Sequence, residues 1–482
     1  MTTKKIIFII LLALLIVIST TIYLAWRFSD WPKSLVGKVS NEVVNQAVKD
    51  PQEKNLMQVV LGFEKPQTYL ILFLNNTELR PGGGFIGAYA LLKMDKGVPS
   101  LLKVEGTEIL DNQGKKDFES VAPAPLSKYL KVSRWYFRDS NWSPDFGFSS
   151  QKAIELFLKQ QGGVGVVGEI DGVIGFTPTL IEEILKIHGP IKVGAEEFNA
   201  KNFTEKLEYE VEYGYSDRGL EFADRKDMLK VLAHSMLTSL RFDVILNWSS
   251  YYNLSQEMLK QKQIVLYSQN IEEEKFLSIK GWSGEMKKND GDYLLWADAN
   301  LGALKTDHAI TRELSYSIRP EKEKFLATAK MKFTHQGNFD WRTSRYRNYV
   351  RVFVPTGSEL VKGTGMMEME KSKQIGVVDT GTENGHQWFG AFIAIEPGKT
   401  GELSFEYYLP INITQQIKSG EYKLLVQKQI GTLGTKLTLG LDFGKQLKSA
   451  YPGEEPIKYG DSRFDLITDL KEDRNFTVNL AQ

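Results

Sequence analysis

The residues best suited to bind an anion stand in the segment Arg80-Pro-Gly-Gly-Gly84. This segment follows an apolar run at residues 69–74, which we expect to form a strand buried on both faces. Ligand sites of α/β sheets lie at such strand ends. The backbone amides of Gly82 and Gly83 can approach an anion closely, and Arg80 adds a guanidinium group. A hairpin turn explains the same glycines, so both interpretations stay open at this point.

A second polar cluster contains Arg138 and Asp139, with Asp145 a few residues further on. Arg138 could hold phosphate oxygens, while Asp139 or Asp145 could act as a catalytic base. Asp139 is also the candidate ligand for a divalent cation such as Mg²⁺. The alternative is a surface ion pair between neighbouring residues, which would contribute little to stability.

A third cluster contains Arg225 and Lys226, which follow Asp224. Asp224 can cap a helix whose first turn then carries both cations. Cations at a helix N-terminus oppose the macrodipole, and a bound anionic ligand would offset that repulsion. We therefore include Arg225 and Lys226 among the candidate ligand-binding residues.

Motifs of other enzyme classes are scarce. The chain has no cysteine, which excludes disulfides, thiolate catalysis and cysteine-based zinc sites. Its five histidines form no closely spaced metal pair. Ser149-Ser-Gln-Lys152 and Lys399-Thr-Gly401 match short motifs of penicillin-binding enzymes. The expected S-x-N element between them is not evident, and a turn after Pro397-Gly398 explains the second motif.

The elements that would position these residues change character along the chain. Apolar residues at helical spacing predict a helix capped by Ser149 or Ser150. A strand at residues 172–176 precedes a helix that begins at Thr177-Pro178. Alternating helices and strands predict an α/β domain with a mixed sheet and flanking helices over residues 66–312. Period-two runs at 349–354, 403–409 and 422–427 predict an all-β sandwich over residues 313–482.

The N-terminal segment has the features of a membrane anchor. Residues 6–26 carry no charge, and a helix of that length spans about 30 Å. Lys4 and Lys5 precede the run, which favours a cytoplasmic N-terminus and an extracytoplasmic bulk. A cleaved signal peptide is the alternative. We therefore expect a cytoplasmic tip and single transmembrane helix over residues 1–26 and a juxtamembrane stalk over residues 27–65.

The charge of the chain bears on its partners. It contains 60 basic and 60 acidic residues. A general nucleic-acid binder needs a strongly cationic surface, so we expect no nucleic-acid partner.

Three sequence blocks read NNTELRPGGGFIGAYALL, WYFRDSNWSPDF and EIDGVIGFTPTLIEEILKIHGPIKV. Together they resemble the DUF4012 family of uncharacterised, membrane-anchored bacterial proteins. The resemblance covers roughly residues 66–320, and the segment RYRNYVRVFVPTGSEL is similar to the C-terminal part of the same family. It implies a membrane-anchored protein of the cell envelope.

More distantly, the α/β part resembles the LytR-CpsA-Psr envelope proteins. The resemblance implies transfer of glycopolymers from polyprenyl-phosphate carriers to the cell wall, with Mg²⁺ and an arginine cluster gripping the phosphates. Arg138 and Asp139 match that family's Arg-Asp motif. Arg225 matches the arginine before the family's glutamine, which is Lys226 here. Arg80 falls near the family's Arg-Ser-Asp motif.

The chain departs from the LytR-CpsA-Psr pattern at two places. The metal-binding aspartate expected after Arg80 is absent, because Pro81 and glycines follow. The pair of arginines before the last helix is also missing, and Glu210 and Glu212 occupy that stretch.

Two hypotheses follow for the function. The first is an envelope protein that binds a polyprenyl phosphate or glycan phosphate and acts as a glycopolymer phosphotransferase. The second is a non-catalytic module for surface adhesion or assembly. Convergence of Arg80, Arg138 and Arg225 on one cleft beside an apolar tunnel would favour the first hypothesis.

Overall fold

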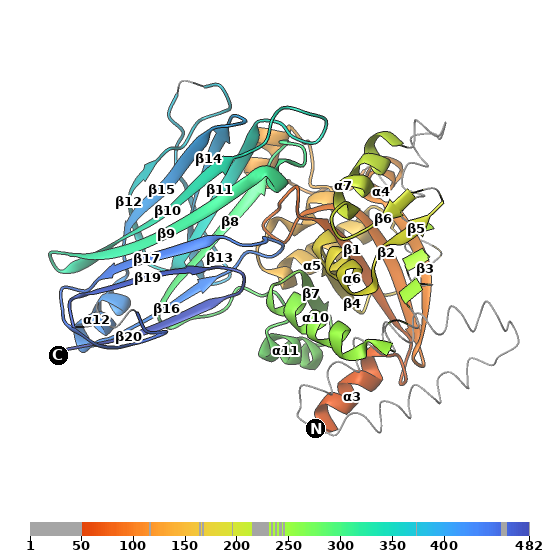
Figure 1. The fold of residues 1–482 in the computed structure, drawn as a ribbon, viewed down its shortest axis with the longest axis horizontal. Coiled ribbons are helices and arrows are strands. Elements are labelled where there is room, and N and C mark those ends of the chain that lie inside the picture. The colour runs from red at the N-terminus through yellow and green to blue at the C-terminus, as the bar shows by residue number, and fades with distance from the viewer. Residues whose placement is uncertain are drawn as a thin grey trace, which may run out of the picture.

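The computed structural model describes residues 51–482, apart from residues 115–116, 163–164, 166–167, 195, 215–230, 233–234, 237–238, 241–242, 244–245, 373, 455–459 and 482. The predicted anchor and most of the predicted stalk lie outside these residues. Among the helices that are described, none is long and apolar enough to cross a bilayer. Figure 1 shows an α/β unit packed side by side with a β sandwich.

The α/β unit contains a five-stranded mixed sheet, as the sequence predicted. Its strand order is β3-β2-β1-β4-β7. β1 pairs antiparallel with β2 and parallel with β4, and β4 pairs antiparallel with β7. The strand bounds are β1 (Gln67–Asn75), β2 (Phe85–Asp95), β3 (Val98–Gly106), β4 (Gly172–Phe176) and β7 (Ile264–Ser268). A separate two-stranded sheet contains β5 (Ile191–Val193) and β6 (Glu196–Phe198).

Helices cover both faces of this sheet (Figure 1). Their bounds are α3 (Pro51–Val60), α4 (Thr107–Gln113), α5 (Phe146–Lys159), α6 (Pro178–His188), α7 (Phe203–Tyr209), α10 (Trp248–Lys260) and α11 (Ile271–Lys280). Short helical turns are η1 (Leu126–Leu130), η2 (Phe137–Trp142) and η3 (Glu210–Gly214). α6 begins after Thr177 with Pro178 in its first turn and stops at Gly189, as predicted.

The cap of α5 differs from the prediction. Asp145 caps the helix, because its carboxylate accepts the backbone N–H of Phe148 at 3.0 Å. Ser149 and Ser150, the predicted caps, lie inside the helix and are fully buried. The Ser149 hydroxyl donates instead to the carbonyl of Ser143.

The β sandwich consists of a seven-stranded and a six-stranded sheet. Their orders are β13-β14-β11-β8-β16-β20-β18 and β12-β15-β10-β9-β17-β19. The strand bounds are β8 (Asp292–Asn300), β9 (Ile310–Glu321), β10 (Lys324–His335), β11 (Tyr346–Pro355), β12 (Glu359–Thr364), β13 (Asp379–Glu383), β14 (His386–Ile395), β15 (Thr400–Tyr408), β16 (Glu421–Gln427), β17 (Lys436–Asp442), β18 (Leu447–Tyr451), β19 (Arg463–Asp469) and β20 (Arg474–Leu480). The helix α12 (Ile411–Ser419) and the turn η5 (Thr306–Ala309) complete it. Because β8 pairs with β11 and β16, the sandwich begins before residue 313.

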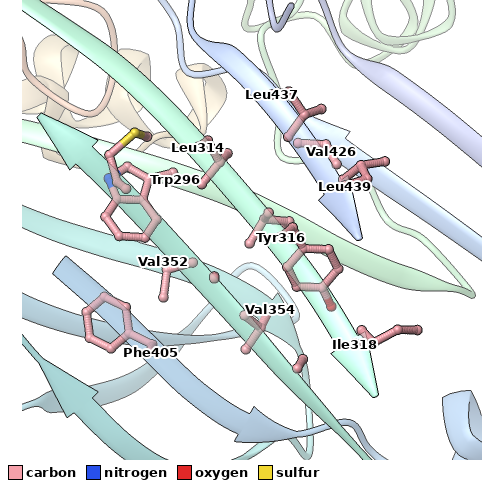
Figure 2. Packing of buried hydrophobic residues seen from close by; sticks show 14 of the residues in the cluster. Trp296, Leu314, Tyr316, Ile318, Val352, Val354, Phe405, Val426, Leu437 and Leu439 are labelled. Atoms are coloured by element: carbon pink, nitrogen blue, oxygen red, sulfur yellow. The ribbon is translucent and has the colours of Figure 1, made fainter. Parts of the chain in front are cut away.

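The two sheets enclose one large apolar core. Figure 2 shows Trp296 and Val352 from the seven-stranded sheet packed near Phe405 and Tyr316 from the six-stranded sheet. The ring centroids of Trp296 and Phe405 lie 5.9 Å apart. Burial of these alternating apolar residues is the main source of stability for the sandwich.

The two units share core residues and hydrogen bonds. Ile430, which follows β16, belongs to the apolar cluster between the five-stranded sheet and α5. Gly82 forms an isolated parallel bridge with Ile430. The loop that contains Arg80 and the three glycines is therefore built into the contact between the two units.

Candidate functional site

A cavity of about 760 Å³ lies on one face of the five-stranded sheet. On the opposite face, Leu70 and Leu72 of β1 belong to the same apolar core as α5. The alternate residues of β1 line the cavity, and the helices α3, α6, α7 and α10 contribute to its other walls. The lining is predominantly apolar, and the volume is typical of a ligand pocket.

Small side chains on β2 leave this space open. Ala88 and Ala90 line the cavity and stand opposite Phe73 and Ile71 in the antiparallel register. Alternate residues of neighbouring strands share one face of the sheet. The short side chains of the two alanines therefore leave space unfilled between this face and the helices. The apolar wall therefore encloses an empty channel instead of a packed core.

The channel follows β1 and has chemically different ends. At the start of the strand, Leu56 and Val60 of α3 line it, and the Tyr69 hydroxyl donates to the carbonyl of Val60 at 3.0 Å. At the end of the strand, the Asn75 amide donates to Glu208 of α7 at 3.0 Å. The lining residues of β1 run from Tyr69 to Asn75, so the two ends lie roughly 20 Å apart along the strand.

The end of the channel near α7 is polar and charged. Glu78, Glu208 and Glu212 line it together with Arg138 and Lys305. The ammonium of Lys305 lies 3.0 Å from the carboxylate of Glu212. Although burial opposes the charge of Lys305, the carboxylates of Glu212 and Glu78 raise its pKa. Burial raises the pKa of Glu78. This end can hold a polar head group while the remainder of the channel holds an apolar chain.

The structure brings Arg138 to this polar end with its side chain still partly accessible. Its guanidinium lies 3.3 Å from Asp111 and 3.9 Å from Asp139, and it stacks 4.6 Å above the Tyr136 ring. The Arg138 side chain is 28 % exposed, against 2 % for Arg80. Of the two predicted arginines that the structure describes, Arg138 thus has the better access to a ligand.

Arg80 is held by internal partners. Its guanidinium lies 3.0 Å from Asp139 and 3.3 Å from Glu78, and it donates to the carbonyl of Asn300 at 2.5 Å. Although burial opposes its charge, Asp139 and Glu78 raise the pKa of Arg80. The structure therefore places Arg80 behind the channel wall, next to β8. Ligand binding by Arg80 stays a prediction.

Gly82 and Gly83 make close backbone contacts next to Arg80. Their amides donate to the carbonyls of Asn141 and Arg80, both at 3.0 Å. Gly83 has a φ of +126°, and a Cβ there would lie 2.8 Å from the side chain of Leu74. These contacts explain the glycines by close packing, as the turn interpretation requires, and leave anion binding by Gly82 and Gly83 a prediction.

The joint between the two units also requires Gly431. A Cβ on Gly431 would lie 2.1 Å from the carbonyl oxygen of Gly83, at a φ of +78°. We expect Gly431→Ala to lower the free energy of unfolding by about 2–3 kcal/mol more than Gly385→Ala. Gly385 is the matched control, because it has a φ of +77° and no atom within 4 Å of its would-be Cβ. Urea denaturation of both variants measures the difference, and equal midpoints would contradict the tight joint.

Asp139 and Asp145, the predicted catalytic carboxylates, are both buried. Besides capping α5, Asp145 accepts the amide of Met286 at 2.8 Å and the side chain of Asn384 at 2.7 Å. These contacts give Asp145 a structural role at the contact between the units. A catalytic role for either carboxylate stays a prediction.

The surroundings of Asp139 do not match a protein-bound Mg²⁺. This ion prefers several oxygen ligands, whereas Asp139 stands between the guanidinium groups of Arg80 and Arg138. In the part of the chain that the structure describes, no three His, Asp or Glu side chains gather as a metal site. Arg225 and Lys226, the remaining predicted ligand residues, lie outside the described residues.

Asp111, the partner of Arg138 near the polar end, makes the free energy of unfolding depend on pH. Burial raises the pKa of Asp111 to about 6, against the opposing effect of Arg138. The folded state therefore binds a proton at Asp111 more readily than the unfolded state, and this stabilisation is lost as the pH rises through about 6. We expect the free energy of unfolding of the wild type to fall by about 2 kcal/mol relative to Asp111→Asn between pH 4 and pH 7. Parallel denaturation curves for the two proteins would contradict this.

Sequence reasoning missed Lys305, Glu208 and Glu212 as a group. Lys305 precedes η5 beside the sandwich, while the two glutamates lie in α7 and η3. About 100 residues separate them, and no local motif links such positions. The apolar lining was also missed, since its residues have the composition of a core.

The class of protein that emerges is an α/β domain with an apolar channel, joined to a β sandwich. Residues 64–212 match the sequence model of the family described as "Protein of unknown function (DUF4012)", which supports the resemblance to that family over this part of the chain. No curated protein matches the chain.

Solved structures give weak similarities. A Legionella pneumophila protein described as a candidate nutrient-binding protein has 9 % identity and a TM-score of 0.24, over 39 % of this chain and 71 % of its own. A structural-genomics target from Listeria innocua has 11 % identity and a TM-score of 0.25, over 45 % of this chain and 78 % of its own. An M1 zinc metallopeptidase from Deinococcus radiodurans has 12 % identity and a TM-score of 0.16, over 36 % of this chain and 42 % of its own. At these TM-scores the similarities carry no argument about function.

Proposed function

We propose that the protein is a membrane-anchored, extracytoplasmic envelope protein that binds a lipid phosphate, with a polyprenyl phosphate as the leading candidate. The observation that carries the proposal is the apolar channel along β1 with a charged end. One long chain would lie along Tyr69, Ile71 and Phe73, and burial of each methylene would contribute about 0.8 kcal/mol. The phosphate would lie at the end near α7.

Two cations among the described lining residues can meet the phosphate. Arg138 faces Asp111 and Lys305 faces Glu212, so a phosphate would compete with these carboxylates for its contacts. The fork of donors on Arg138 suits two phosphate oxygens, while Lys305 supplies a point charge. In a glycopolymer transfer these groups would stabilise charge on the transferred phosphate, which is a form of electrostatic catalysis.

The experiment is lipid extraction from purified protein followed by mass spectrometry. We expect a single-chain lipid phosphate to accompany the wild type and to decrease severalfold in Arg138→Gln. Arg134→Gln is the matched control, because Arg134 lies four residues away, packs on the rings of Phe118 and Tyr136, and does not line the channel. Repeated extraction of wild type without any lipid would contradict the proposal and favour a role in adhesion or assembly.

A further inference from the structure

Three aromatic side chains gather beside the polar end of the channel. Tyr209 closes α7, Tyr213 lies in η3, and Trp341 comes from the loop between β10 and β11 of the sandwich. The ring centroids of Tyr209 and Tyr213 lie 5.8 Å apart, and Trp341 lies 5.5 Å from Tyr209 and 5.8 Å from Tyr213. Tyr209 and Tyr213 are 41 % and 46 % exposed. The three rings form an accessible aromatic cluster, the Tyr209–Trp341 cluster.

The cluster borders the segment that lines the polar end of the channel, although its three rings are not among the lining residues. Leu207, Glu208, Val211 and Glu212 line the channel from the same helical segment that carries the two tyrosines. On the sandwich side, Arg342, next to Trp341, donates to Glu208 at 2.5 Å. A ligand that extends from the polar end past Glu208 and Glu212 would reach the aromatic rings.

The chemistry around the rings fits a sugar. A pyranose ring offers C–H faces of slight positive charge, which stack on the negative faces of aromatic rings, and hydroxyls around its edge. Glu212, 37 % exposed in its side chain, can accept hydrogen bonds from hydroxyls, and Lys305 can donate them. A purely apolar partner would cover the Lys305–Glu212 ion pair without offering it hydrogen bonds.

The position of the cluster argues against contact with a bilayer. The cluster adjoins the α7 end of the channel, whereas α3, which follows the predicted anchor, lines the opposite end. Figure 1 likewise places α3 and α7 at opposite ends of the α/β unit. A membrane surface near α3 would therefore lie roughly 20 Å from the rings along β1.

We infer that the Tyr209–Trp341 cluster is a carbohydrate-binding subsite that holds the first sugar of a glycosylated lipid whose chain occupies the channel. The inference rests on the proposed lipid binding and goes further, because it assigns the ligand a sugar and gives that sugar its own contacts. It also explains why one ring comes from the sandwich: the subsite exists only where the two units meet.

Two probes with the same chain separate the sugar from the lipid. Dodecyl maltoside carries sugar rings, and a dodecyl oligo(ethylene glycol) ether carries a polar head without a ring. Isothermal titration calorimetry below their micelle concentrations gives both affinities. We expect the wild type to prefer the maltoside by about tenfold, the effect of one or two aromatic contacts.

The variants keep or remove the rings. Tyr209→Ser with Tyr213→Ser should abolish the preference and leave the affinity for the ether unchanged. Tyr209→Phe with Tyr213→Phe keeps both rings and should keep most of the preference. Tyr451→Ser, which removes an exposed tyrosine of β18 in the sandwich, is the matched control and should behave as the wild type.

Each other outcome overturns a different statement. A wild type that binds both probes equally, or a serine variant that keeps the preference, overturns the sugar subsite alone. A wild type that binds neither probe overturns the lipid proposal as well. Binding to vesicles without glycolipid that is lost in the serine variant would make the cluster a membrane contact and overturn the inference.

Discussion

Replacing Ala90 with phenylalanine should close the channel to a lipid chain. Ala90 is 2 % exposed, faces the channel and stands opposite Ile71 of β1. The added ring would occupy the space of at least two methylenes, each of which contributes about 0.8 kcal/mol when buried. We therefore expect the affinity for a fluorescent long-chain fatty acid to fall by about tenfold or more.

Ala124→Phe is the control for this substitution, because Ala124 is exposed and does not line the channel. Circular dichroism and the urea midpoint should show that Ala90→Phe keeps its fold, since the new ring enters empty space. Unchanged fatty-acid affinity in a folded Ala90→Phe variant would mean that the chain binds elsewhere.

Replacing Arg80 with methionine should destabilise the whole protein. Asp139 and Glu78 would lose the guanidinium that compensates their buried charges. We expect the free energy of unfolding to fall by about 3–5 kcal/mol, as when one partner of a buried ion pair is removed. The loss should be larger at pH 8 than at pH 5. Without Arg80 the pKa of Glu78 rises further, and protonation at lower pH removes the uncompensated charge.

The control is Arg463→Met in β19, where the guanidinium pairs with Asp465 at 3.2 Å and is 51 % exposed. An exposed pair contributes about 0–1 kcal/mol, so this variant should unfold close to the wild type. If Arg80 instead serves a ligand, Arg80→Met would unfold like the control and lose lipid binding. Denaturation curves and lipid titrations of the two variants distinguish these roles.

Much of the fold could be predicted from periodicity. The period-two runs at residues 349–354, 403–409 and 422–427 correspond to β11, β15 and β16. β8 was missed as part of the sandwich, because all nine of its residues are buried and show no alternation. Its second face is covered by the α/β unit, and only the tertiary structure provides that cover.

The channel could not be predicted from the sequence, for a physical reason. In β1, residues that line an empty space and residues that fill a core have the same apolar character. Leu72 lies on the face of the sheet that α5 covers, whereas its neighbours Ile71 and Phe73 lie on the other face and line the cavity. The two small residues of β2 are the local signal, and it has meaning only once the register with β1 is known.

The polar clusters were predicted in part. Arg80 and Arg138 both lie beside Asp139, as the first hypothesis expects of these two arginines, whereas Arg225 lies outside the described residues. Sequence could not show which arginine is accessible, because burial of Arg80 depends on Asn300 of β8. Asp145 caps α5 because it directly precedes Phe146, the first residue of that helix. Its other partners come from distant segments of the chain, and the sequence does not indicate them.

The joint at Ile430 and Gly431 sets an order for folding. Gln429 donates to the carbonyl of Arg80 at 3.0 Å across 349 residues of sequence, and Ile430 completes a core whose other members precede residue 270. A chain made from its N-terminus cannot close that contact until most of the sandwich has been synthesised. Nascent chains should thus carry an α/β unit whose apolar core beside α5 is incomplete. Translation that stops before residue 430 would leave that core exposed and yield a substrate for chaperones and proteases.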